Sequence, residues 1–431
     1  MGFATSYLKR HQLFPAHISE PPSGLLNFIV VIPVYNEDNL QKTLTSLYNC
    51  ERPKTHVEII LVFNSSETDT EKVKNQNTRT LNLIRNWLTE KNTTNFRFHI
   101  LHFPDLPKKF AGAGLARKIG MDTAVSRFDQ LDRKNGIILS LDADTLCSTN
   151  YFTAIESAIL NDPDINGFTI YFEHSLSGDE FPAPVYQAIT QYELHMRYYI
   201  EGLRYAGFPY AFHTVGSCFG VTAETYCKQG GMNRRQGGED FYFLHKVIPQ
   251  GKFTEINNTT LYPSSRPSSR VPFGTGPVIQ KLMDSQNNEL ETFHPVAFDE
   301  LKKFIRLKDK FFNKAPDVLR LIYEKLPVSI CSFINAADFT SALSEINANC
   351  SSSSSFIKRF YQWFNAFRVF KFLNHASSNF FPKKGVSFAA NELLKKFEYS
   401  GEYGLPHIEL LKIYRNYQRH HIHITHPSLL Q

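Results

Sequence analysis

Cysteine is scarce in this sequence: six residues of 431, none in a Cys-x-x-Cys spacing. We therefore expect no disulfide framework and no zinc site of that pattern, and the simplest interpretation is reduced thiols in a cytoplasmic protein. No apolar run approaches the roughly 18 residues that cross a bilayer, and residues 1–20 lack the apolar centre of a secretory signal. The expected location is cytoplasmic, with peripheral contact at the inner membrane face as an alternative.

A strong charge of one sign is also absent. Lys and Arg number 47 against 41 for Asp and Glu, which gives a formal net charge of +6. This mild excess is compatible with phosphate-bearing ligands or an anionic surface, and we expect no nucleic-acid partner. With 42% hydrophobic and 20% charged residues, the chain has the composition of a folded protein of two to three domains.

Strand-like and helix-like patterns alternate through the first 280 residues. The runs expected to be strands are 28–33, 57–63, 97–103, 136–144, 168–172, 215–222 and 253–261. The first four alternate with helical patterns, which predicts parallel pairing with right-handed crossovers. The expected fold class is α/β, a doubly wound mixed sheet whose loops gather at one edge.

Beyond residue 280 the expected strands stop. The helices expected there are 296–312, 317–325, 336–346 and 356–373. We therefore predict an irregular lead-in over 1–26, an α/β domain over 27–280 and a helical region over 281–431.

Two aspartates end the fourth expected strand. Asp142 and Asp144 are two residues apart, so they share one face, and a slight turn would let both approach one divalent cation. Open α/β sheets bind ligands at the carboxyl ends of their strands. The alternative is ordinary turn chemistry at a strand end.

A second acidic pair, Glu239 and Asp240, follows two glycines at an expected helix start. Backbone N–H groups and the helix dipole should lower the pKa of a carboxyl there and hold it ionised. An ionised carboxylate suits a general base. The alternative is an acid that only caps the helix.

The order of these motifs resembles that of family 2 glycosyltransferases of the GT-A fold, over residues 27–276. Residues 32–37 (Ile-Pro-Val-Tyr-Asn-Glu) look like the family's opening strand and loop. Residues 142–144 look like its metal-binding Asp-x-Asp motif, and residues 238–240 like the motif that carries its catalytic base.

The resemblance implies an inverting hexosyltransferase. Asp142 and Asp144 would hold Mg²⁺ or Mn²⁺ against the leaving diphosphate, and Asp240, with Glu239 beside it, would deprotonate the acceptor hydroxyl. The Gln-x-x-Arg-Trp motif and membrane helices of processive synthases are missing, which favours one sugar added per encounter. The expected donor is UDP- or GDP-linked, and the expected acceptor is a lipid-linked or cell-surface glycan precursor.

The resemblance also assigns a donor-nucleotide site. Its residues are Pro33, Tyr35, Asn36, Glu37, Asn64, Arg117, Asp142, Arg266 and Arg270. Asn64 stands where many relatives have an aspartate that contacts the nucleobase, so uracil and guanine stay open. Arg117 ends a small-residue segment, 111–117, for which packing on the sheet is the alternative. Arg266 and Arg270 suit a mobile lid over a diphosphate, with a solvated loop as the alternative.

Residues His213, Gly216 and Ser217 correspond to the acceptor side of the family's site. For His213, a satisfied polar group is the alternative. Serine occupies the position at which some relatives have a metal-binding histidine, which leaves His213 or His245 as remote candidates.

The expected helix 356–373 carries aromatic residues on one face and basic residues away from it. Packing on the catalytic domain and peripheral membrane contact are the two interpretations. Two other functions also stay open: a nucleotidyltransferase of the same fold, and a non-catalytic protein that binds sugar nucleotides or acts as a scaffold.

Overall fold

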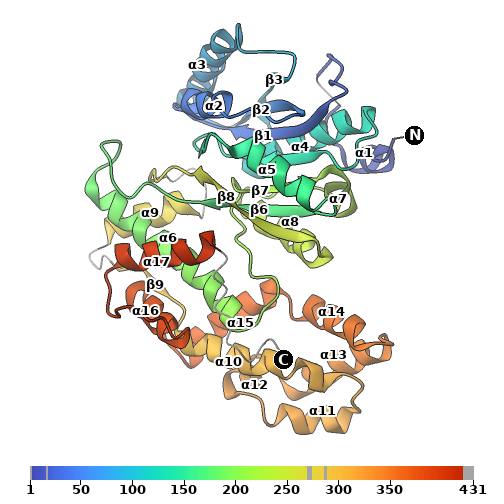
Figure 1. Ribbon diagram of the computed structural model, residues 1–431, viewed down its shortest axis with the longest axis vertical. Coiled ribbons are helices and arrows are strands. Elements are labelled where there is room, and N and C mark those ends of the chain that lie inside the picture. Colours follow the sequence, from blue (N-terminus) through green and yellow to red (C-terminus); the bar gives the residue numbers. More distant parts are fainter. Residues whose placement is uncertain (1, 16–17, 269–273, 286–288, 421–431) are drawn as a thin grey trace. The chain divides into compact units, whose positions relative to one another are not determined.

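The computed structural model describes residues 2–15, 18–268, 274–285 and 289–420 and divides the chain into two units (Figure 1). The first unit comprises Met1–Tyr186 and Thr214–Gln280, and the second comprises Gln187–His213 and Lys281–Gln431. Residues 187–213 thus group with the C-terminal helices. The predicted domain limits remain a proposal.

An eight-stranded mixed sheet forms the core of the first unit. Its strands lie in the order β3 (Phe96–Leu106), β2 (His56–Ser66), β1 (Leu26–Val34), β4 (Ile137–Ser140), β7 (Phe219–Thr222), β6 (Gly167–Phe172), β8 (Phe253–Tyr262) and β5 (Leu146–Cys147). The first four are parallel, whereas β7 is antiparallel to β4 and β6. Strand β8 pairs parallel with β6 and antiparallel with β5. The predicted α/β class with a mixed sheet is confirmed.

The central strands are continuous apolar runs because helices cover them. Helix α4 (Ala113–Gln130) packs against β1 and β2, and α3 (Glu71–Leu88) packs against β2 (Figure 1). A Cβ atom at Gly120 would lie 2.4 Å from Cγ1 of Val31, so glycine allows α4 to approach β1 this closely. This packing fixes the carboxyl ends of β1 and β4, where the predicted site lies.

The remaining helices of the first unit connect these strands. They are α1 (Thr5–His11), α2 (Leu40–Tyr48), α5 (Tyr151–Asn161), α7 (Ala223–Lys228), α8 (Glu239–Val247) and the short η1 (Ile248–Gln250). Helix α1 lies in the segment expected to be irregular. It is held there because the Tyr7 hydroxyl donates to Oδ1 of Asp122 at 2.8 Å and the Ala4 amide donates to Oδ1 of Asp129 at 2.6 Å.

The second unit is mostly helical. Its helices are most of α6 (Ala183–Tyr205), the end of α9 (Thr275–Asp284), α10 (Pro295–Arg306), η2 (Lys308–Phe311), α11 (Pro316–Tyr323), α12 (Val328–Phe333), α13 (Ala336–Ala348), α14 (Ser353–Trp363), α15 (Ala366–Asn379), α16 (Val386–Lys396) and α17 (His407–Arg419). A two-stranded antiparallel ladder, β9 (Glu291–Thr292) with β10 (Lys384–Gly385), accompanies them. None of the helices in the described residues is both long and apolar enough to cross a membrane.

The expected helix 356–373 is two helices, α14 and α15. They separate because Asn365 caps α15, where its side chain accepts a hydrogen bond from the Arg368 amide at 3.0 Å. On α14 and just after it, Phe356, Phe360 and Phe364 are all 0% exposed. These three rings therefore belong to the core of the second unit.

A buried polar network joins α6 to α17 in the second unit. Arg415 donates from Nε and Nη2 to the two carboxylate oxygens of Glu193, each at 2.7 Å. Arg197 donates to Glu193 at 2.8 Å and to the Gln418 side-chain oxygen at 2.6 Å. The Gln418 amide donates in turn to Glu201 at 2.8 Å. The network compensates the desolvation of these charges and fixes where α17 packs.

Candidate functional site

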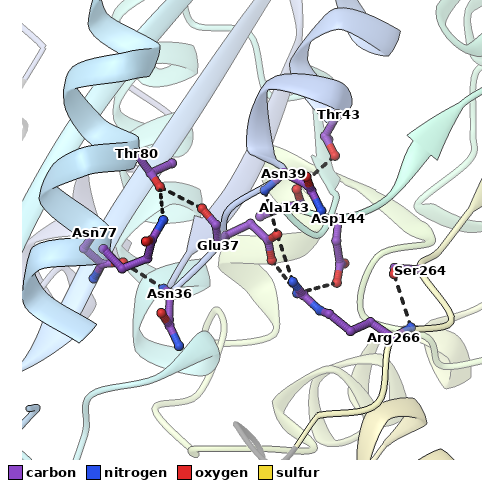
Figure 2. A network of polar contacts seen from close by, with 11 residues as sticks. Asn36, Glu37, Asn39, Thr43, Asn77, Thr80, Ala143, Asp144, Ser264 and Arg266 are labelled. Atoms are coloured by element: carbon purple, nitrogen blue, oxygen red, sulfur yellow. Dashed lines mark hydrogen bonds and ion pairs between the residues drawn. The ribbon is translucent and has the colours of Figure 1, made fainter. Parts of the chain in front are cut away.

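The loop after β1 is held in a bent conformation by α3. Asn36 has a left-handed backbone (φ 47°), and its amide donates to Oδ1 of Asn77 at 2.7 Å. The Thr80 hydroxyl donates to the Glu37 carbonyl oxygen at 2.8 Å (Figure 2). Asparagine tolerates the left-handed region better than most residues. These contacts fix the position of the Glu37 carboxylate.

Arg266 connects that carboxylate to the Asp-x-Asp triplet. Its Nη1 and Nη2 lie 3.1 and 2.5 Å from the two carboxylate oxygens of Glu37, and Nη2 also lies 3.2 Å from Oδ2 of Asp144. Figure 2 shows the guanidinium group between these two acids. Burial opposes the charge of Arg266, but Glu37 and Asp144 raise its pKa overall. Three segments far apart in the chain are thereby brought together.

Arg117 makes an equivalent connection deeper in the unit. Its side chain is 5% exposed, and it forms ion pairs with both Asp142 and Glu239. Its Nε donates to Oγ of Ser140 at 3.1 Å. Although burial alone would lower the pKa of Arg117, Asp142 and Glu239 raise it, so the guanidinium stays charged. The metal-motif aspartate and the start of α8 are therefore held on one cation.

Asp240 behaves differently from the sequence expectation. Burial and the neighbouring Glu239 raise its pKa to about 7, although Arg117 and the Phe241 amide favour its ionised form. The prediction that the helix start lowers this pKa is wrong, because desolvation and a second carboxylate outweigh the helix N-terminus. A carboxyl with a pKa near 7 can both accept and release a proton at neutral pH.

Gly216 lies against both of these charged groups. A Cβ atom at Gly216 would be 2.8 Å from Nη2 of Arg117 and 2.9 Å from Oδ2 of Asp240. Only a residue without a side chain allows the backbone this close to the two groups. The structure thus brings Gly216 together with the predicted base and metal motifs.

Other predicted donor-site residues lie at the carboxyl ends of β1 and β2. Pro33 is in β1, close to its end, and the Tyr35 hydroxyl donates to Oδ1 of Asp69 at 3.1 Å. The Asn64 amide donates to the Val34 carbonyl oxygen at 3.1 Å. Its Oδ1 is buried and has no hydrogen-bond partner among the described residues.

The small-residue segment before α4 packs on the protein itself. A Cβ atom at Gly114 would lie 2.1 Å from the carbonyl oxygen of Arg235, and Gly112, with φ 143°, lies against Gln236. These contacts account for both glycines by close packing, the alternative considered for residues 111–117.

The other predicted site residues have partners of their own. His213 belongs to the second unit, where its Nε2 lies 3.0 Å from Oε1 of Gln418, and burial and Arg197 lower its pKa to about 3. The Ser217 hydroxyl contacts the Cys218 thiol at 3.3 Å. His245 lies on α8 with its ring 3.8 Å from that of Phe241, and burial lowers its pKa to about 4. Arg270 lies outside the described residues.

Asp142 and Asp144 have the chemistry of a hard-cation site. Their side chains are 39% and 28% exposed, so a cation could reach both carboxylates. In the described part of the chain, no cluster of three or more His, Cys, Asp or Glu could hold a metal ion. The two aspartates thus fit Mg²⁺ or Mn²⁺ only if donor phosphates and water supply the other ligands, as Mg²⁺ commonly requires.

Sequence reasoning missed Ser140, Asn77 and Thr80, which orient Arg117 and the loop after β1. Ser140 left a signal, because it is the one polar residue in the apolar run 137–141. Asn77 and Thr80 lie on the buried face of α3, a helix in which most residues are polar. Nothing in their local sequence distinguishes them from surface residues.

Part of the sequence matches a known protein family. Residues 29–223 match the model of the family described as glycosyl transferase family 2. This segment belongs to glycosyl transferase family 2. The match includes Asp142, Asp144 and Gly216 of the site and ends before Glu239, Asp240 and Arg266. The protein is accordingly a glycosyltransferase with a GT-A domain.

Solved structures with related folds include those of S. aureus TarS. TarS 1-349 in complex with UDP-GlcNAc is 15% identical, with 82% of this chain and 91% of that chain covered and a TM-score of 0.39. TarS 1-349 without a named ligand is 12% identical, with coverage of 80% and 93% and a TM-score of 0.37. No curated protein sequence matches this glycosyltransferase.

Proposed function

We propose that this glycosyltransferase transfers one sugar per encounter, with inversion, from a UDP- or GDP-sugar to an acceptor hydroxyl of a cell-surface or lipid-linked glycan precursor. The observation that carries the proposal is the arrangement around Arg117. One buried guanidinium holds Asp142, from the end of β4, and Glu239, next to Asp240. This arrangement would hold the proposed cation site and the proposed base in a fixed relation to each other.

Asp142 and Asp144 would hold a Mg²⁺ or Mn²⁺ ion, which would stabilise the negative charge of the leaving diphosphate. Arg266 is placed to bind the same diphosphate, because it already contacts Asp144 and its fork-shaped guanidinium matches phosphate oxygens. Arg117 is a positioning residue in this proposal. At 5% exposure it is too buried to contact the donor, unlike Arg266 at 24%.

Asp240 would accept the proton of the acceptor hydroxyl as the oxygen attacks the anomeric carbon. With a pKa of about 7, it is a stronger base than an ordinary carboxylate and is still partly ionised at neutral pH. A single base with direct attack gives inversion. Gly216 would let the acceptor approach Asp240, because no side chain stands on that backbone.

The nucleobase contact assigned to Asn64 follows from its unsatisfied oxygen. With its amide engaged by Val34, Oδ1 could accept the imide N–H of uracil once the loop exposes it. The N1–H of guanine could donate to the same oxygen, so both UDP and GDP remain candidates for the donor nucleotide.

A donor screen tests the proposal. The full chain is incubated with UDP- and GDP-sugars, with Mg²⁺, Mn²⁺ or EDTA, and released nucleoside diphosphate is measured. We expect metal-dependent release with one donor, and a product of inverted anomeric configuration by NMR. Release of pyrophosphate from a sugar phosphate and a nucleoside triphosphate would instead identify a nucleotidyltransferase. Metal-dependent binding with no release for any donor, in the presence of acceptor, would identify a non-catalytic protein.

A further inference from the structure

Three exposed phenylalanines lie in one part of the second unit. Phe367 and Phe370 on α15 are 37% and 41% exposed, and Phe388 on α16 is 49% exposed. In the described part of the chain, no other phenylalanine is classed as exposed. For a protein with 37 phenylalanines, this confinement to residues 367–388 indicates a specific apolar surface.

Ring contacts connect this region into one surface. Phe370 lies 6.0 Å from Phe293 between ring centroids, and Phe388 lies 6.4 Å from the adjacent His294. Phe381, in the connection between α15 and α16, lies 6.2 Å from the same His294. Phe370, Phe381 and Phe388 thus each contact one of two consecutive residues, Phe293 and His294.

Lysines border these rings. Nζ of Lys371 lies 4.6 Å from the ring centroid of Phe367, and Nζ of Lys383 lies 5.6 Å from that of Phe293. Lys384 follows directly and is also exposed. We call this set the aromatic–lysine patch, and it consists of Phe367, Phe370, Phe381, Phe388, Lys371, Lys383 and Lys384.

The patch lies in a stretch of chain without acidic residues. Residues 346–391 contain four lysines and two arginines but no Asp or Glu. Two acids approach from outside this stretch, because Glu291 faces Gly385 across the β9–β10 ladder and Glu289 also lies against Gly385. The nearby basic residues are Arg368 and Lys371 on α15 and Lys383 and Lys384 after it. The local excess of positive charge equals the formal net charge of the whole protein, +6.

We propose that the aromatic–lysine patch docks this protein on the surface of an anionic lipid bilayer. Insertion of phenylalanine rings at the boundary between headgroups and acyl chains is favourable, and anionic headgroups attract lysines. A protein partner fits the patch less well, because lysine is depleted in protein interfaces. The buried rings of α14 take no part. The proposal goes beyond the catalytic function and does not depend on it.

Vesicle sedimentation tests the proposal. The full chain is mixed with vesicles of phosphatidylcholine containing 30% phosphatidylglycerol, or of phosphatidylcholine alone. We expect binding to the anionic vesicles that weakens at high salt because the charges are screened. Lys383→Glu with Lys384→Glu should weaken it by more than tenfold, since each lysine near an anionic surface contributes about fivefold. Phe370→Ser with Phe388→Ser should weaken binding to a similar extent.

Matched controls use the same substitutions elsewhere in the second unit. Leu321 and Val328 are 60% and 72% exposed but lie outside residues 346–391, so Leu321→Ser with Val328→Ser should bind as the unchanged protein does. Lys310→Glu with Lys325→Glu is the charge control. Circular dichroism and thermal melting confirm that each variant folds. If the phenylalanine variant does not fold, the result with the lysine variant decides the test.

Two results would overturn the proposal. One is a lack of specificity: equal sedimentation with both kinds of vesicle, or an equal loss of vesicle binding in the patch variants and the control variants. The other is a concentration-dependent dimer, seen by analytical ultracentrifugation, that the patch variants abolish without any vesicle binding, because the patch would then join two copies of this chain. Release of nucleoside diphosphate is measured without vesicles, so failure of the proposed catalytic function is seen separately.

Discussion

Each unit contains a cluster of arginines and carboxylates, and the two clusters differ in exposure. In the second unit, the side chains of Glu193 and Arg197 are 0% and 1% exposed. In the first unit, Asp142 and Asp144 are paired with arginines in the same way, yet their side chains are 39% and 28% exposed. The residue types do not distinguish the clusters.

The difference shows what makes such a cluster able to bind a ligand. Charges that are fully enclosed have already exchanged water for protein partners, and removing one partner leaves the others unpaired. Such a network contributes only to the stability of the packing between α6 and α17. Carboxylates with exposed edges can exchange an arginine for a cation or a phosphate-bound cation. We therefore expect substitutions in the first unit to change turnover and substitutions in the second to change stability.

The largest effect is expected for Asp240→Asn. Loss of the base should lower turnover by about 10²- to 10⁴-fold, measured as nucleoside diphosphate release. The free energy of unfolding at pH 8 should not fall: the raised pKa of Asp240 means that its ionised form is disfavoured in the folded state, and asparagine removes that cost. Asp162→Asn, at an exposed position of the same unit, is the control. Full turnover of Asp240→Asn would contradict the assignment of the base.

Glu193→Gln should have the converse effect. It leaves Arg197 and Arg415 buried without their carboxylate, and breaking a buried pair costs about 3–5 kcal/mol. Urea unfolding measures this loss. The control is Glu409→Gln, which removes an exposed pair with Lys412 and should cost less than about 1 kcal/mol. Similar losses in both variants would show that burial does not distinguish these pairs.

The pH dependence of turnover tests whether the exposed cluster of the first unit contains the base. Because the base acts in its ionised form, kcat/KM should fall about tenfold per pH unit below the Asp240 pKa of about 7 and level off above it. Glu239→Gln removes a negative neighbour that raises this pKa, so the acid limb should move to lower pH. An acid limb that stays in place would exclude Glu239 as the cause of the shift.

The smallest effect is expected for Arg266→Gln. Its side chain is 24% exposed, but that of its partner Glu37 is 2% exposed, so the loss of Arg266 leaves a buried carboxylate without this partner and should cost about 1–3 kcal/mol of unfolding free energy. If Arg266 binds the diphosphate, the donor KM should rise by about tenfold, the loss of one charged hydrogen bond. Arg79→Gln, an exposed substitution on α3, is the control. An unchanged KM and kcat would make Arg266 a structural residue.

Much of the first unit could be predicted from the sequence. Apolar runs with period-2 or continuous patterns place β1, β2, β3 and β4 within a few residues of their observed bounds. The acidic residues after β4 and at the start of α8 also lie where the pattern puts them. Strand 215–222 is the exception, because it begins only at Phe219, after Ser217 has turned toward Cys218.

Local patterns failed where a contact from elsewhere in the chain decides the outcome. Asp129 and Asp122 hold α1 in a segment that contains few signals of its own. The expected helix 356–373 is divided because Asn365 caps a new helix.

By itself, the sequence determined the order of strands and helices and the presence of paired acids at two of their ends, because both depend on residues that are near neighbours in the chain. Only the tertiary structure decided how those acids are paired and charged. Arg117 contacts Glu239 across 122 positions, and Arg266 contacts Glu37 across 229. The pKa of Asp240 likewise depends on what surrounds it in space. Desolvation and ion pairing arise from distances in the folded chain, which periodicity does not encode.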